Sequence, residues 1–327
     1  MPQNSALYAV ARIRALEAGL FNKDRLLRLM EGGAKNAMKQ LSESGYGSMP
    51  DAGEGDLERM IANELAKAYA VVRELSTDPV LTDVFLMRAD VINLKLLIKL
   101  RILGADETPA MALGGLYLPE QLARMVQDGD YSLLPAPFRN ALEGVEAEIL
   151  EGSVKPQRIS VELDKAYIWY ALQSGREFAI RYFSTKADFD NLLTLLRSRA
   201  MGLDAKQVEN ALLPAGSISH ERLIPAYDMP IEDLADHLSF GEAAAAIRKG
   251  LEEASASGTL TPLERERDNY LLAMASRGKG EIDTIAPVIG YLLAREQEAR
   301  CIRLIITAAR NSLNASVIEE RLREVYG

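Results

Sequence analysis

The chain has 327 residues, of which 48% are hydrophobic and 26% are charged, and its formal net charge is -9. This composition can bury hydrophobic cores, so the chain is expected to fold rather than remain disordered. The negative charge argues against a protein whose main task is to neutralise nucleic-acid phosphates or to adhere broadly to anionic lipid. Cys301 is the only cysteine. It therefore excludes an internal disulfide and a cysteine metal cluster, and we expect it to be a small core residue in a reducing cytoplasm.

Length and residue usage also indicate the architecture. Domains usually hold about 100 to 200 residues, so several packed modules are expected. Leu, Ala, Arg and Glu recur throughout, whereas alternating β-branched runs are scarce, which favours an all-α fold. The apolar stretch 94–103 is interrupted by Lys95, Lys99 and Arg101, so it lacks the ~20 uncharged residues of a bilayer span. Residues 1–15 lack the apolar core and cleavage site of a signal peptide.

The first part of the chain alternates helical and loop patterns. Residues 5–41 carry apolar residues at helical spacing, which predicts two or three helices. Residues 42–55 are rich in Ser and Gly and are expected to form a loop. A further helix is expected from about residue 57 to residue 75.

Two later segments share one pattern, which is the main organisational signal in the sequence. In each, an Asp and an Asn precede Leu and basic residues, and a glycine follows. The first copy consists of Asp90, Asn93, Leu94, Leu97, Lys99, Arg101 and Gly104, and the second of Asp188, Asn191, Leu192, Leu195, Arg197, Arg199 and Gly202. Each copy precedes a second matched set, Gly115, Glu120 and Leu122 in one case and Gly216, Glu221 and Leu223 in the other. A period of about 100 residues therefore predicts an internal duplication.

Each copy describes a buried helix that ends at its glycine. The two leucine positions of each copy lie three apart and are expected on one buried face. The basic positions fall in the last turns, where they complement the helix C-terminus, and Gly104 or Gly202 can adopt the left-handed cap conformation. Asn93 and Asn191 are unusual inside helices. We interpret their amides as fixing a helix packing or a connecting loop rather than binding a ligand.

The remaining segments are also predicted to be helical. Residues 160–183 carry many aromatic side chains and are expected to form one heavily buried helix, in which those side chains belong to the core. Residues 291–309 should form a helix in which Glu296 and Arg300 are paired at i and i+4. A last helix is expected over residues 316–326.

No set of residues indicates catalysis. The stretch Arg277-Gly278-Lys279-Gly280 lacks the first glycine and the Ser or Thr of a phosphate-binding loop, so the chain is not expected to hydrolyse ATP. The two histidines, His220 and His237, belong to no zinc or di-iron pattern. We therefore predict no catalytic residue, no cofactor and no metal.

Several of these segments resemble the C subunit of V-type ATPases, which is called the d subunit in eukaryotes. The resemblance rests on residues 8–17 (YAVARIRALE), on Asp90 to Lys95 with Lys99, on Asp190 to Leu192 with Arg197 and Arg199, and on the stretch from Tyr291 through Glu296, Glu298 and Arg303 to Tyr326. These matches span nearly the whole chain. Residues 42–47 (SESGYG) depart from the usual Leu-x-x-Thr-x-Tyr pattern, which leaves Tyr46 as the counterpart of its tyrosine.

The resemblance implies three similar helical modules that form a funnel with pseudo-threefold symmetry. We expect these modules at residues 1–112, 113–213 and 214–327. In that family the funnel sits on the cytoplasmic face of the membrane proteolipid rotor ring, receives the end of the central shaft and carries no active site. The resemblance thus implies a coupling subunit that is monomeric alone, present in one copy per complex and attached to the membrane through its protein partners.

Two other interpretations of the sequence stay open. One is a helical enzyme of unknown chemistry, and the other is a generic helical scaffold protein. Common helical repeats are about 33 to 47 residues long, far shorter than the repeat found here. Three equivalent modules around an open axis would favour the coupling subunit, whereas a pocket of converging ionisable groups would favour an enzyme.

Overall fold

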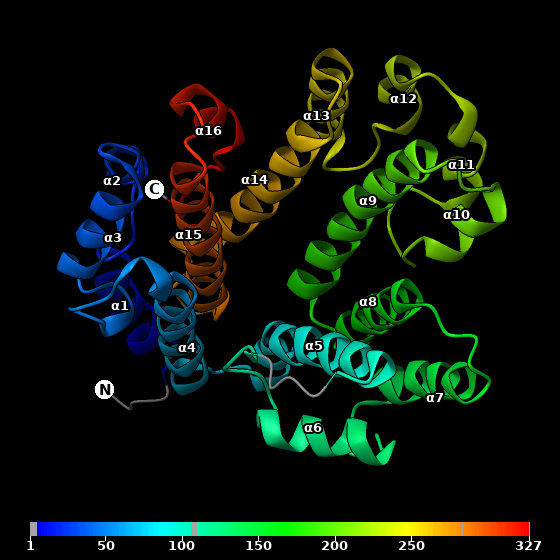
Figure 1. The fold of residues 1–327 in the computed structure, drawn as a ribbon, viewed down its shortest axis with the longest axis horizontal. Coiled ribbons are helices and arrows are strands. Elements are labelled where there is room, and N and C mark those ends of the chain that lie inside the picture. The colour runs from blue at the N-terminus through cyan, green and yellow to red at the C-terminus, as the bar shows by residue number, and fades with distance from the viewer. Residues whose placement is uncertain (1–4, 106–109, 283, 327) are drawn as a thin grey trace. The chain divides into compact units, whose positions relative to one another are not determined.

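The computed structural model describes residues 5–105, 110–282 and 284–326 (Figure 1). In these ranges every regular element is an α-helix or a short 3-10 helix. The all-α fold predicted from the sequence is therefore confirmed. Within the same ranges, no helix combines the length and the apolar composition that crossing a membrane requires.

The chain divides into two compact units, Met1–Thr82 with Glu264–Gly327 and Asp83–Leu263. Unit 1 contains α1 (Ala6–Glu17), α2 (Lys23–Leu29), α3 (Gly33–Glu43), η1 (Tyr46–Ser48), η2 (Glu54–Asp56), α4 (Leu57–Leu75), η4 (Gly278–Gly280), α15 (Ala286–Arg310) and α16 (Ala315–Arg321). Unit 2 contains α6 (Pro119–Asp128), α7 (Ala136–Leu150), α8 (Pro156–Gln173), α9 (Glu177–Ala200), α10 (Ala205–Ala211), α11 (His220–Leu223), η3 (Pro225–Asp228), α12 (Ile231–Leu238) and α13 (Ala244–Ser257). Two helices, α5 (Pro79–Leu103) and α14 (Thr261–Arg277), cross the boundaries between the units.

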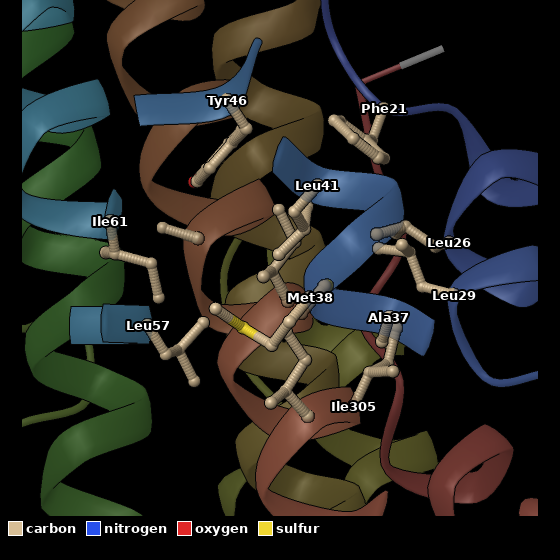
Figure 2. Close-up of a cluster of buried hydrophobic side chains, with 14 of the residues drawn as sticks. Phe21, Leu26, Leu29, Ala37, Met38, Leu41, Tyr46, Leu57, Ile61 and Ile305 are labelled. Carbon is tan, nitrogen blue, oxygen red and sulfur yellow. The ribbon is translucent and has the colours of Figure 1, made fainter. Parts of the chain in front are cut away.

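Unit 1 is organised around α15. This helix contacts α1, α2, α3, α4, α16 and η4, so helices from the start of the chain pack against one from its end. A single apolar cluster fills the space between them, and Figure 2 shows Met38 and Leu41 of α3 in the middle of it. Cys301 is fully buried in the same cluster, as predicted. Close packing of this kind makes an interior stiff because few voids remain for side chains to move into.

The helices of unit 1 follow the sequence closely. Ser5 caps α1 by accepting the backbone N–H of Tyr8 at 3.2 Å, which satisfies one of the unpaired donors at the helix start. The expected helices within residues 5–41 are α1, α2 and α3, and the expected helix 57–75 is α4 with those same limits. The last helix, α16, is shorter than predicted, because residues beyond Arg321 continue in an extended path.

Unit 2 contains a second set of packed helices. Helix α8 contacts both α7 and α9, and α9 also contacts α10, α11 and η3. Helix α12 packs against α13. The apolar face predicted for the two repeat copies is buried at Leu94, Leu192 and Leu195, whereas Leu97 is only half-buried.

The prediction of one continuous buried helix over residues 160–183 is wrong. The segment is divided between α8 and α9 by Ser174 to Arg176, where Gly175 has a φ of 66°. A glycine adopts this left-handed conformation without the steric cost that a Cβ would bring, so it ends α8 and turns the chain. The aromatic side chains are also unequal, since Tyr167 is buried while Trp169 is 47% exposed. The division into three modules at residues 112 and 213 stays a prediction.

Candidate functional site

The repeat positions lie at junctions between a long helix and the loop that follows it, and we call each such junction a joint. In the first joint, Asp90 of α5 is fully buried. Its carboxylate accepts the backbone N–H groups of Leu116, at 2.6 Å, and Tyr117, at 3.3 Å. A Cβ on Gly115 would lie 2.1 Å from the Asp90 Oδ1 atom. The loop can therefore approach the carboxylate this closely only because residue 115 is a glycine.

The second joint repeats this construction in α9. Asp188 is buried, and its two carboxylate oxygens accept the Ile218 backbone N–H at 2.9 Å and the Ser217 hydroxyl at 2.7 Å. A Cβ on Gly216 would lie 2.3 Å from the Asp188 Oδ1 atom. Burial raises the pKa of Asp188, and the hydrogen bonds from Ile218 and Ser217 oppose that rise without cancelling it.

The two asparagines hold the same loops three residues further along each helix. Asn93 donates its amide N–H to the Ala112 carbonyl oxygen at 2.9 Å and accepts the Ala112 backbone N–H at 2.8 Å. Asn191 bonds both backbone groups of Leu213 in the same way, at 3.0 and 2.7 Å. Each amide thus supplies the hydrogen-bond partners that a neighbouring strand or helix would otherwise give to the loop backbone.

One basic position in each copy also bonds to the segment that follows the loop. Arg101 donates to the carbonyl oxygen of Val126, and Arg199 donates to that of Ala226. Arg101 additionally pairs with Glu146, with 2.5 Å between the Nη2 and Oε1 atoms. These guanidinium groups are structural, because their donors are directed at the protein's own backbone and side chains.

The other repeat positions have simpler roles. Gly104 and Gly202 end their helices with φ angles of 61° and 66°, which is the left-handed cap expected for glycine. Lys99 is half-buried and Arg197 is exposed. The sequence pattern therefore contains members of the joint together with members that only share its periodicity.

A third joint lies in unit 1, and the sequence pattern did not reveal it. Glu298 of α15 is 1% exposed, and its Oε2 atom accepts the backbone N–H of Phe21 at 2.5 Å. Gly19 precedes Phe21 by two residues, which is the spacing of the glycines in the other two joints. Ser312 has a φ of 54° and follows Glu298 by fourteen positions, as Gly104 follows Asp90. The shared spacing was hidden because Glu replaces Asp and Cys301 stands where the other copies have Asn.

The third joint also contains a cation. Arg295 Nη1 lies 2.7 Å from Glu298 Oε1 and 3.6 Å from Glu64 Oε1. Burial raises the pKa of Glu298, and the neighbouring Arg295 opposes this effect. Burial also works against the charge of Arg295, but Glu298 and Tyr291 keep its pKa above the ordinary value. One guanidinium between two carboxylates thus connects α15 to α4 in the interior of unit 1.

The structure gives these residues no arrangement suited to reaction chemistry. Among the described residues, no group of His, Cys, Asp and Glu is placed to hold a metal ion. Burial raises the pKa of the Cys301 thiol to about 11, so it is protonated and unreactive near neutral pH. The Nε2 atom of His220 lies 2.9 Å from the carbonyl oxygen of Leu213, within one of the joints. The joints can hold loops against helices, and their polar groups are occupied in doing so.

An all-helical chain whose long helices are joined to their loops by buried carboxylates defines a structural class of protein rather than a chemical one. The model of the family described as ATP synthase (C/AC39) subunit matches residues 9–321. The chain belongs to this family.

Curated relatives share the match over almost their whole length, and each of them is the C subunit of a rotary complex. The one from the A-type ATP synthase of Thermococcus kodakarensis is 26% identical over 339 residues, covering 97% of this chain and 90% of the relative. The one from the V-type sodium ATPase of Enterococcus hirae is 22% identical over 320 residues, covering 96% of this chain and 97% of the relative. The one from the A-type ATP synthase of Methanocaldococcus jannaschii is 24% identical, covering 96% of this chain and 85% of the relative.

Proposed function

We propose that this chain is the non-catalytic coupling subunit in the central stalk of a rotary V-type or A-type ATPase. In this role it joins the central shaft to the membrane proteolipid ring on the cytoplasmic side, in one copy per complex. It carries torque between ATP turnover in the soluble head and movement of protons or sodium ions through the membrane. Family membership across residues 9–321 and relatives that are C subunits of such complexes support this proposal.

We also propose that the chain is built from three similar modules around one axis, in the form of a funnel. The observation that carries this proposal is the recurrence of the joint on α5, α9 and α15. The third joint takes its backbone N–H from Phe21, so the third module, as proposed here, combines α15 with the first helices of the chain. Three similar modules would give the shaft three similar contacts, as repeat architectures generally do.

A torque-bearing part must resist deformation, and the joints contribute to this. A loop that is held only by its own backbone moves readily, because few buried contacts oppose its motion. In the first two joints, side-chain carboxylates and amides fix the loop at several backbone groups. Buried polar groups whose hydrogen bonds are satisfied favour one arrangement over its alternatives, since any other arrangement leaves them unpaired. Force applied to a loop would therefore pass into the long helix behind it.

The experiment that tests the coupling role is deletion of the chain from its native complex. ATP hydrolysis by the soluble head should remain largely intact, while ion pumping into membrane vesicles should be lost and should return when the chain is added back. Pumping at the normal rate without the chain would refute the proposal.

A second experiment tests the proposed partners. The tagged chain is captured from gently solubilised membranes, and the co-purifying proteins are identified. Recovery of proteolipid, shaft and nucleotide-binding subunits is expected. Capture of the chain alone, under conditions in which the rest of the complex stays assembled, would contradict the proposed attachment.

A further inference from the structure

A groove of about 790 Å³ lies in unit 1 between α2 and the segment that contains α16 and the residues after it. Four apolar side chains form its floor: Leu26, Leu27, Leu322 and Val325. Leu26 is fully buried, whereas the other three are partly accessible. Cavities of about 300–1,000 Å³ hold small ligands or a few side chains of a peptide, so the groove is of a size that binds a short segment.

The rim of the groove is acidic. Asp24, Glu319 and Glu324 are exposed on it, and Lys23 is the exposed cation beside them. Among the described residues these three carboxylates form no ion pair, so their charges face solvent. Arg323 also lines the groove, but its Nε atom lies 3.2 Å from Asp268 Oδ2, and this buried pairing takes up its charge.

The floor and the rim together define the chemistry of an occupant. Burial of apolar side chains on the floor contributes most of the binding energy in such a site, since the hydrophobic effect scales with the area removed from water. The excess of carboxylates on the rim favours a cationic partner, repels an acidic one and raises the rate of encounter. Anionic lipid headgroups are therefore disfavoured, and a peptide with apolar and basic side chains fits both features.

We infer that this groove is a docking site for a cationic, apolar segment of a partner protein. The occupant places Leu-like side chains between α2 and the residues after α16, and its Lys or Arg side chains meet Asp24, Glu319 and Glu324. Recognition by an apolar face with flanking cations is a common way in which proteins bind short amphipathic segments. Such binding is independent of the proposed coupling role, so a negative result here leaves that role unaffected.

The test uses the full-length chain and a fluorescein-labelled amphipathic peptide made of Leu and Lys residues, with binding followed by fluorescence anisotropy at physiological salt. Saturable binding is expected. The triple variant D24K/E319K/E324K should bind the peptide at least tenfold more weakly. Leu27→Asn, which leaves the net charge unchanged, should also weaken binding several-fold because it makes the floor polar.

A matched control separates the groove from general attraction to an acidic protein. The triple variant E31K/D128K/E151K changes the net charge by the same amount at exposed carboxylates outside the groove. It should bind within twofold of the original chain, and a peptide of Leu and Glu residues should not bind. Equal loss of affinity in the two triple variants, unchanged binding by Leu27→Asn, or the absence of saturable binding would overturn the inference.

Discussion

The joints make a quantitative prediction that is easiest to test at Asn191. This residue is fully buried, and its amide satisfies both the N–H and the carbonyl oxygen of Leu213, at 2.7 and 3.0 Å. Replacement by Leu keeps a similar volume but removes both hydrogen bonds. The backbone groups of Leu213 then remain in the interior without these partners, and the free energy of unfolding should fall.

The expected loss follows from the cost of each orphaned group. A buried backbone group without a partner costs roughly 1–3 kcal/mol, so two groups cost about 4 kcal/mol. The buried Leu side chain returns roughly 2 kcal/mol through the hydrophobic effect. Unit 2 of Asn191→Leu should therefore be less stable by about 2 kcal/mol. With a urea dependence of roughly 2 kcal/mol/M, its unfolding midpoint should fall by about 1 M.

The chain contains a convenient probe for this measurement. Trp169 is the only tryptophan and lies in unit 2, so intrinsic fluorescence during urea unfolding reports on the unit that contains Asn191. Asn210→Leu is the matched control, because it makes the same chemical change at an exposed position of the same unit. If both variants unfold at the same urea concentration as the original chain, the structural role assigned to the Asn191 amide is wrong.

Three further predictions concern unit 2. Gly216→Ala places a Cβ 2.3 Å from Asp188 Oδ1 and should cost about 1–3 kcal/mol in urea unfolding, whereas Gly144→Ala, in an open helical position, should gain up to about 1 kcal/mol; equal effects would contradict the close approach. Asp188 has a folded pKa above its ordinary value of 3.8, so its titration favours the folded state at low pH and loses this contribution as pH rises through the folded pKa. The stability of the original chain relative to Asp188→Asn, measured by thermal unfolding between about pH 4 and pH 7, should therefore decline with rising pH, and the opposite slope would refute the assignment. Leu195→Asp should lower stability by more than about 3 kcal/mol because it buries a charge, whereas Leu103→Asp, at a position that is 70% exposed, should change it by less than about 0.5 kcal/mol.

Local signals in the sequence were sufficient for most helices. Apolar periodicity located α4 and α15, because a helix that buries one face must repeat apolar residues at that period. The same reasoning failed at Gly175, where a periodic pattern continued across a break. A left-handed glycine can interrupt a helix without altering the apolar spacing on either side of it.

The candidate joints were only partly predictable. The pairs Asp90 with Asp188 and Asn93 with Asn191 were visible because both copies lie in one chain order with the same residue types. Their acceptors and donors were not visible, since the backbone groups they bind carry no sequence signature. The third carboxylate, Glu298, was missed because its residue type differs from that of its counterparts.

The helical class, the length of most helices and the duplication could be read from the order of residues alone, since these depend on periodicity, caps and turns within a few residues. Which loop each carboxylate holds became known only from the folded chain. Glu298 and Phe21, for example, are 277 positions apart, and no local preference could pair them. Contacts over such distances are selected by the packing of the whole unit, because a buried charge is stable only where the fold brings it a partner.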